Sequence, residues 1–136
     1  MKVRKAVTLV VIALGVGAAF TEVFGRAPGE VQVIDVSAKK YEFAPAEIHV
    51  KVGARVQIKL HPTDKTHGIK LQPNSEGSNP QGPAGLRFIG QSSIHAGKNE
   101  EAVLEFVAER AGTYLFECSK FCGLGHKGMR GKLVVE

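Results

Sequence analysis

This sequence of 136 residues has no tryptophan and only two cysteines, so a disulfide-rich framework is excluded. No stretch interleaves basic with aromatic residues, the pattern typical of nucleic-acid-binding surfaces, and we expect no nucleic-acid partner. A nucleophile–base pair, a phosphate-binding loop and a carboxylate dyad are also missing. On its own, the chain is therefore not expected to be a catalyst.

The net charge of +5 is unevenly distributed along the chain. Lys2, Arg4 and Lys5 lie before the first apolar run, whereas from residue 26 onward 15 basic residues accompany 12 acidic ones. The total length supports one domain rather than two.

Residues 1–25 differ in composition from the rest of the chain. A basic flank precedes an apolar run of about 15 residues from Ala6 to Phe20, which is the pattern of a secretory signal peptide. Extended to Phe24, the run has 19 residues, close to the length of a membrane-spanning helix. We expect a hydrophobic N-terminal helix that anchors the chain in the cytoplasmic membrane; a cleaved signal peptide and secretion to the periplasm are the alternative. Either way, the remainder lies on the periplasmic or extracytoplasmic side.

Residues 26–30 form a short linker, and residues 31–136 are predicted to form one all-β domain. Apolar and polar residues alternate over 48–52 and again over 56–60, with a turn at Gly53–Ala54. Many short strands at this spacing predict a β-sandwich. The predicted strands are 31–36, 48–52, 56–60, 102–107, 113–118 and 132–135.

Residues 72–85 contain three prolines and three glycines and almost no apolar residue, which predicts a long loop. Loops of this length in a compact domain are often functional. Two interpretations remain open: the loop covers the end of the domain that carries the metal ligands described next, or it is a solvated insertion without a role.

Cys118, Cys122, His126 and Met129 lie within twelve residues near the C-terminus. Two thiols, an imidazole and a thioether are soft ligands, and this combination favours copper. A disulfide or a redox dithiol is the alternative, but four residues of separation would strain the bridge, and redox motifs usually have two intervening residues. We therefore predict a metal site on the loop between the last two strands.

A further ligand has to come from elsewhere in the chain. His67, in the sequence Asp64-Lys-Thr-His67-Gly, follows the strand that ends near Leu60 and is placed to reach the same end of the sandwich. His61 is its rival, and we favour His67.

These motifs resemble the cupredoxin family, and within it the binuclear copper A (CuA) domain of cytochrome c oxidase subunit II and of nitrous-oxide reductases. The resemblance covers about residues 31–136 and implies a Greek-key cupredoxin sandwich. It rests on Asp64-x-x-His67-Gly, Gly112-x-Tyr-x-Phe-x-Cys118 and Cys118-x3-Cys122-Gly-x-Gly-His126-x2-Met129.

By this resemblance, Cys118 and Cys122 would bridge two copper ions through their sulfurs. The other ligands would be His67, His126, Met129 and the backbone carbonyl of Lys120. The implied function is electron transfer from a small carrier, such as a cytochrome c or a cupredoxin, to the catalytic subunit of a heme–copper oxidase in a respiratory chain.

The sequence departs from this family pattern in three ways. Lys120 stands where many of these subunits carry an acid that contacts a magnesium ion at the neighbouring subunit. The tryptophan at which electrons enter many of these subunits is missing. Lys120, Lys127, Arg130 and Lys132 predict a basic ligand end, so a donor with an acidic or apolar docking face fits better than a strongly basic cytochrome.

Two other functions remain as alternatives. A free-standing periplasmic electron shuttle would hold one copper in a blue site formed by His67, Cys122, His126 and Met129, which leaves Cys118 idle. A copper carrier or assembly protein would release its metal, whereas the closed ligand set favours retention.

Overall fold

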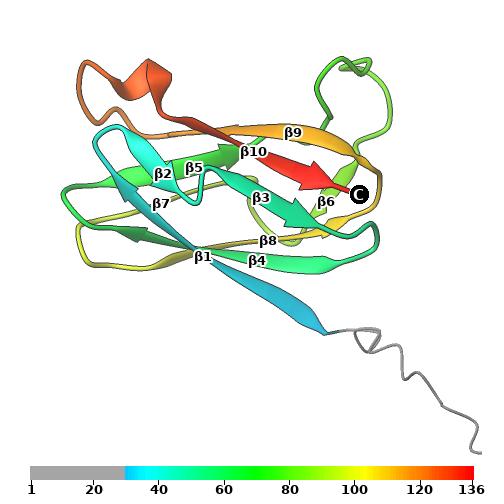
Figure 1. Cartoon of the computed structure of the whole chain (residues 1–136), viewed down its shortest axis with the longest axis horizontal. Coiled ribbons are helices and arrows are strands. Elements are labelled where there is room, and N and C mark those ends of the chain that lie inside the picture. Colours follow the sequence, from blue (N-terminus) through cyan, green and yellow to red (C-terminus); the bar gives the residue numbers. More distant parts are fainter. Residues whose placement is uncertain (1–29) are drawn as a thin grey trace, which may run out of the picture.

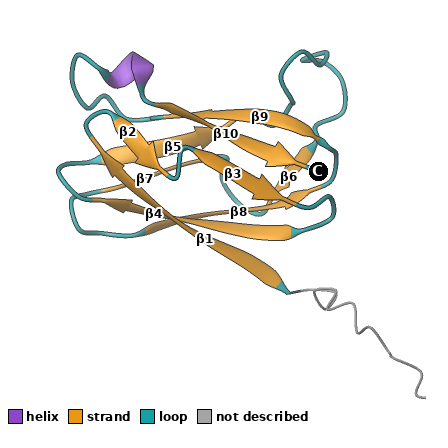
Figure 2. Cartoon of the chain, in the orientation of Figure 1, coloured by secondary structure: helices purple, strands orange, loops and turns teal. Residues whose placement is uncertain are grey.

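The computed structural model describes residues 30–136, and Figure 1 and Figure 2 show two five-stranded β-sheets packed face to face. The predicted helix over 1–25 and most of the linker lie outside the described residues. Among residues 30–136, no helix is both long enough and apolar enough to cross a membrane. The all-β prediction for the domain is confirmed.

The first sheet has the order β2-β1-β4-β8-β6. Its strands are β2 (Glu42–Ala44), β1 (Val31–Lys39), β4 (Arg55–Pro62), β8 (Ala102–Ala108) and β6 (Leu86–Phe88). β1 runs parallel to β4, and the other neighbours are antiparallel. This sheet carries none of the predicted metal ligands.

The second sheet has the order β3-β10-β9-β5-β7. Its strands are β3 (Glu47–Val50), β10 (Arg130–Val135), β9 (Gly112–Glu117), β5 (His67–Leu71) and β7 (Ser93–Ala96), and a single 3-10 turn, η1 (His126–Gly128), precedes β10. β3 and β10 are parallel, whereas β9 pairs antiparallel with both β10 and β5. The sheet therefore brings His67 on β5 close to the residues that follow β9.

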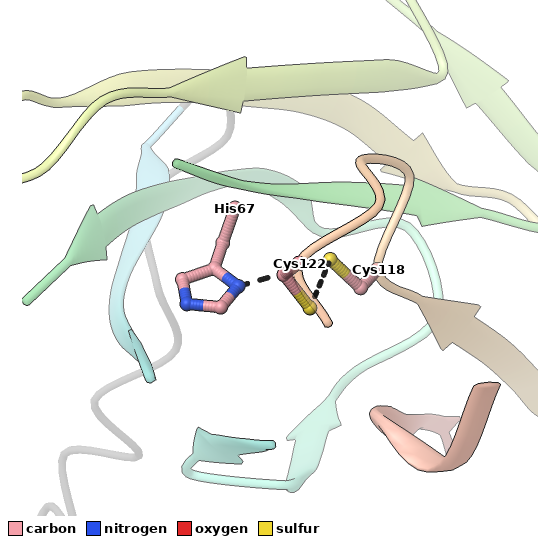
Figure 3. Close-up of side chains that lie close together, drawn as sticks. All are labelled: His67, Cys118 and Cys122. Carbon is pink, nitrogen blue, oxygen red and sulfur yellow. Dashed lines mark hydrogen bonds between the residues drawn. The ribbon is translucent and has the colours of Figure 1, made fainter. Parts of the chain in front are cut away.

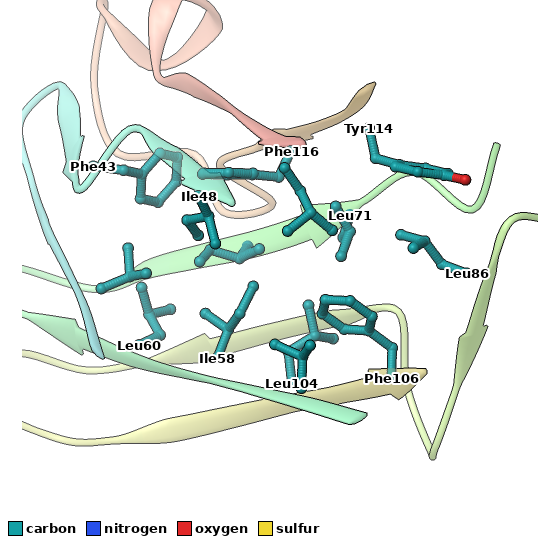
Figure 4. Packing of buried hydrophobic residues seen from close by; sticks show 14 of the residues in the cluster. Phe43, Ile48, Ile58, Leu60, Leu71, Leu86, Leu104, Phe106, Tyr114 and Phe116 are labelled. Atoms are coloured by element: carbon teal, nitrogen blue, oxygen red, sulfur yellow. The ribbon is translucent and has the colours of Figure 1, made fainter. Parts of the chain in front are cut away.

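The core lies between the two sheets and is built from alternating strand positions (Figure 4). Val56, Ile58 and Leu60 of β4 are fully buried, as the period-two pattern predicted. Phe43 and Phe116 join the sheets edge to face, with ring centroids 5.3 Å apart. This apolar layer provides a rigid support for the loops at both ends of the sandwich.

Each of the six predicted strands is present, but β2, β5, β6 and β7 were not predicted. β5 lacks the alternation on which the prediction depended, since every residue except Lys70 is buried. β2 and β6 have only three residues each, too few to show a period.

Residues 72–85 lie at the opposite end of the sandwich from the connection between β9 and β10, so the interpretation that this loop covers the ligand end is wrong (Figure 1, green loop). The amide of Gln72 donates to the carbonyl of Leu115 at 3.0 Å, and the amide of Glu76 donates to Thr113 at 2.7 Å. These contacts lead the loop back along β9 toward its first residue, whereas Cys118 follows its last one.

Candidate metal centre

The segment from Cys118 to Met129, called here the ligand loop, is closed at its base. The amide of Cys118 donates to the carbonyl of Met129 at 3.0 Å, so the loop begins and ends at one point between β9 and β10. The hydroxyl of Ser119 donates to the carbonyl of Ile94 at 3.0 Å, which ties the loop to β7. The loop is thus held at its base, between β9 and β10, and by β7.

The two cysteine sulfurs face each other in the interior at a distance of 3.9 Å (Figure 3). Both side chains are buried, and both thiols are free. A disulfide would bring the sulfurs to about 2.05 Å. Two thiolates on one tetrahedral ion, each about 2.3 Å from it, would lie roughly 3.8 Å apart. The observed spacing therefore excludes a disulfide and is compatible with a metal that both sulfurs share.

His67 is the first residue of β5 and is fully buried. Its Nδ1 lies 3.9 Å from Cys118 Sγ, and its Nε2 lies 2.6 Å from Asp64 Oδ1 on the other side of the ring. If Nε2 carries the proton and donates it to Asp64, the Nδ1 lone pair faces the sulfurs. A carboxylate behind a histidine in this way is the usual orienting contact of a metal ligand.

Asp64 is itself held by a second segment. The backbone amide of Lys40 donates to Asp64 Oδ2 at 2.8 Å. Partial burial raises the pKa of the Asp64 carboxyl, but the hydrogen bonds from Lys40 and His67 outweigh it and bring the pKa below its ordinary value. Asp64 therefore remains a carboxylate at neutral pH.

The remaining predicted ligands gather around the same two sulfurs. His126 Nδ1 lies 3.6 Å and Met129 Sδ 3.9 Å from Cys122 Sγ, and the carbonyl oxygen of Lys120 lies 3.1 Å from Cys118 Sγ. Each thiol thus has one imidazole beside it. The donor atoms of His67, Cys118 and Cys122 all lie within 4.8 Å of one another, and the other three predicted donors each contact one of the two sulfurs.

His61 does not join this cluster. Its Nε2 lies 2.8 Å from Asp35 Oδ1, and the pair sits on neighbouring strands β1 and β4 of the first sheet. His67, which we favoured, is the histidine that the structure puts beside the sulfurs.

The donor set fits copper. Burial, and then the neighbouring Cys118, raises the pKa of the Cys122 thiol to about 11, so this sulfur is protonated at neutral pH when no metal is bound. A bound metal has to displace that proton, which only a strongly thiophilic ion does effectively. Thiolates, a thioether and imidazoles are ligands that suit copper, and a backbone carbonyl can be a weak further ligand.

Sequence reasoning missed one residue that shapes the loop, Tyr41. Tyr41, at the turn between β1 and β2, packs against the backbone at Gly123 and Gly125 so closely that a Cβ at either position would collide with its ring. Gly123 also has a φ of 137°, a conformation that L side chains rarely adopt. The run of glycines was visible in the sequence, but the aromatic partner comes from a distant segment.

Gly68 has a similar role next to His67. A Cβ there would collide with the hydroxyl of Ser119 and would lie 2.6 Å from the carbonyl of Ile94. The glycine after His67 in the sequence motif is therefore required for the ligand loop to approach β5.

The chain is similar to known proteins in both sequence and structure. The profile of the Cupredoxin-like domain family matches residues 6–135. Cytochrome c oxidase subunit 2 of Thermus thermophilus is 28% identical over 101 residues, which cover 74% of this chain and 63% of that subunit. The chain thus spans less than two thirds of this relative.

Among solved structures, a heme-copper terminal oxidase dimer has a chain that is similar at a TM-score of 0.57 and 25% identity, with 77% of this chain and 65% of that one covered. Auracyanin A, a blue copper protein of Chloroflexus aurantiacus, also gives a TM-score of 0.57, at 20% identity, with 79% and 100% covered. The second likeness is evidence of a shared fold alone.

Proposed function

This chain belongs to the cupredoxin-like domain family, and we propose that it transfers electrons through a binuclear copper A centre, as subunit II or a subunit II-like protein of a heme–copper oxidase. One observation carries the proposal. Both cysteine sulfurs lie inside the donor cluster, 3.9 Å apart, and each has its own imidazole neighbour. A site for a single copper needs only one of these two thiols.

In this proposal, Cys118 and Cys122 would hold the copper pair through their sulfurs. His67 and His126 would each contribute Nδ1, with Met129 and the Lys120 carbonyl as weaker donors. The bound copper pair supplies a one-electron redox couple.

The protein's own residues keep the ligands in place during electron transfer. Cys118, Cys122, Met129 and His67 are at most 4% exposed, so water is excluded from most of the donor cluster. Asp64 fixes the ring of His67, and the Cys118–Met129 backbone bond fixes the base of the loop. Ligands that cannot move when the charge changes keep the reorganisation energy low.

The partners follow from the same similarity and are part of the proposal. A heme–copper catalytic subunit would accept the electron, and a small soluble carrier would deliver it. Residues 1–25 would hold the domain at the periplasmic face of the cytoplasmic membrane, where both partners are within reach.

Copper stoichiometry and spin resonance test the proposal directly. Protein loaded with copper and purified should hold two coppers per chain and show a mixed-valence signal shared by two nuclei. One copper per chain with an intense blue absorption would contradict it.

A mononuclear blue-copper shuttle is the second candidate, because His126 and Met129 both lie beside Cys122 rather than Cys118. With His67 these residues would form a complete blue site. Cys118 would then be a buried thiol without a role, 3.1 Å from a carbonyl oxygen and 3.9 Å from His67 Nδ1. A copper carrier fits less well, since burial of the sulfurs opposes release.

A further inference from the structure

The ligand loop exposes two large apolar side chains at the end of the molecule where the donors gather. Leu124 is 99% exposed and Phe121 76%, the two highest values among the exposed large hydrophobic side chains of residues 30–136. Phe121 lies against the ring of His126, with the centroids 5.7 Å apart. Neither side chain contributes to the core, so folding does not explain their character.

His126 lies between this apolar surface and the sulfurs. Its Nδ1 faces Cys122 Sγ, and the residue is half-buried. The opposite edge of the ring is therefore the part of the donor cluster nearest to Phe121 and to solvent. An electron that crosses this surface meets His126 first.

Two other segments lie beside the ligand loop. Tyr41, which is 38% exposed, packs on the loop at Gly123 and Gly125. The amide of Lys40 binds Asp64, the carboxylate that holds His67. The turns at 40–41 and 64–65 thus share one end of the sandwich with the ligand loop (Figure 1).

These three segments carry four lysines, namely Lys40, Lys65, Lys120 and Lys127. In the described part of the chain, none of the four forms an ion pair. Lys65 directly follows Asp64, whose carboxylate lies 2.6 Å from Nε2 of His67. The acidic residues nearby are already engaged: Asp64 accepts bonds from Lys40 and His67, and Glu42 pairs with Lys39 at 3.1 Å.

The four basic residues named from the sequence lie on two different elements. Arg130 and Lys132 belong to β10 and line a groove with Ala46, Glu47 and Leu115 on the second sheet. Neither residue lies within the ligand loop, whereas Lys120 and Lys127 do. The positive charge at this end comes from Lys120 and Lys127 of the ligand loop, together with Lys40 and Lys65, which distant segments contribute.

We infer that this surface, formed by Phe121, Leu124, Tyr41 and the four lysines, binds a small soluble electron carrier whose docking face is apolar at its centre and lined by carboxylates. The inference rests on the proposed function and adds the chemistry of the donor. Carboxylates steer the carrier toward the lysines, while apolar contact with Phe121 and Leu124 excludes water and brings it close to His126. A carrier with a strongly basic face is repelled.

The test uses the copper-loaded protein and two reduced donors of similar size, an acidic and a basic c-type cytochrome. Stopped-flow absorbance gives the second-order rate constant for each donor as the ionic strength is raised from low salt to about 1 M. The rate with the acidic donor should fall as salt screens the attraction, and the rate with the basic donor should rise. The opposite pair of slopes, or two equal slopes, overturns the inference.

Charge-matched variants locate the surface. Lys40→Glu/Lys127→Glu should slow the acidic donor about tenfold or more at low salt, since steering changes association rates by 10 to 1,000-fold. Lys51→Glu/Lys132→Glu reverses the same number of charges away from the ligand loop and should leave the rate within about twofold. Equal slowing by both pairs would show that only net charge matters, and would overturn the inference.

The apolar centre is tested separately. Leu124→Ser removes a side chain that is 99% exposed, so the fold has no need of it. This variant should lower the rate constant with the acidic donor even at high salt, where the lysines are screened. An unchanged rate constant there contradicts the apolar contact.

Two further outcomes separate the inference from the proposed function. If the loaded protein holds its copper pair but accepts electrons from neither cytochrome, the proposed function fails. If it accepts electrons from both without a charge preference, only the inference fails.

Discussion

The two ends of the sandwich are stabilised by different kinds of interaction. At the end opposite the ligand loop, backbone bonds join the turns to the sheets: the amide of Val52 donates to Glu136 at 3.1 Å, that of Gly53 to Ala108, and that of Glu136 to Val50. At the ligand end, the interior holds thiols, a thioether and an imidazole. The first end is complete without a metal, whereas the second gathers donors that a metal would satisfy.

This difference suggests that stability and function are carried by separate parts of the same domain. The apolar core reaches the ligand end, where Cys118, Cys122 and Met129 are part of the buried cluster. Only a few contacts hold the loop itself, chiefly Cys118 to Met129, Ser119 to Ile94 and Tyr41 over Gly123. Substitutions in the two regions should therefore have distinct consequences.

The largest expected effect is the loss of the copper centre on removal of either sulfur. Cys118→Ser should abolish the mixed-valence copper signal as completely as Cys122→Ser, because the proposed centre would need both sulfurs. The metal-free variants should unfold within a few degrees of the metal-free parent, since the oxygen replaces a sulfur that only the metal needs. Spin resonance and thermal unfolding of the same samples check both statements.

The same pair of variants decides between the two proposed sites. A Cys118→Ser protein that keeps a normal copper spectrum and redox activity supports the mononuclear shuttle instead.

A substitution in the core should have the opposite consequence. Phe106 is fully buried between the sheets, and Phe106→Ala should lower the free energy of unfolding of the metal-free protein by about 3–5 kcal/mol. The copper spectrum of the fraction that remains folded should not change. Val103→Ala on the same strand, where the side chain is 42% exposed, serves as the control and should cost less than about 1 kcal/mol.

Urea unfolding and copper titration measure these two quantities. If Phe106→Ala removed the copper signal from protein that is still folded, the core and the ligand end would not be independent.

A third substitution probes the connection between the fold and the site. Asp64→Ala should weaken copper binding about 10–100-fold, because it frees the ring of His67 and leaves its Nε2–H buried without an acceptor. Asp64→Asn keeps an acceptor oxygen and should fall between the parent and Asp64→Ala.

Competition with a copper chelator gives the affinities. Asp35→Asn, which alters the partner of His61 on the first sheet, is the matched control and should bind copper as the parent does. Equal affinity in Asp64→Ala and the parent would contradict the orienting role.

The sequence predicted the fold where periodicity was visible and failed where it was not. β4 alternates perfectly and was predicted, whereas β5 is buried at four of five positions and was missed. The ligand loop was predicted because its donors lie within twelve residues, so spacing alone brings them together. The assignment of each donor to copper stays a prediction.

Other contacts lie beyond what local spacing reveals. Tyr41 and Lys40 reach the ligand end only because the β1–β2 turn folds over it, which depends on the strand order of the first sheet. For the same reason, the position of residues 72–85 could not be deduced: their place depends on the direction in which β5 and β9 pair.

The smallest expected effect is a pH-dependent contribution to stability from His49 on β3 and its two carboxylate partners. His49 Nε2 lies 2.7 Å from Glu47 Oε1, and its Nδ1 lies 3.3 Å from Glu136 Oε1. These hydrogen bonds, that from Glu47 first, raise the pKa of His49 above 6.5 in the folded protein. Because the pKa of His49 is higher in the folded than in the unfolded protein, its protonation stabilises the fold. This stabilisation is complete below the pKa of the unfolded protein and is lost as the pH rises through the pKa of the folded protein.

The urea midpoint of the metal-free parent should therefore exceed that of His49→Gln at pH 5.5, and the difference should disappear by pH 9. In a Glu47→Gln background the gap at pH 5.5 should shrink, because the main partner is gone. Copper affinity at fixed pH should be the same in all these variants, and a gap that stays constant with pH would show that the ion pairs contribute nothing to stability.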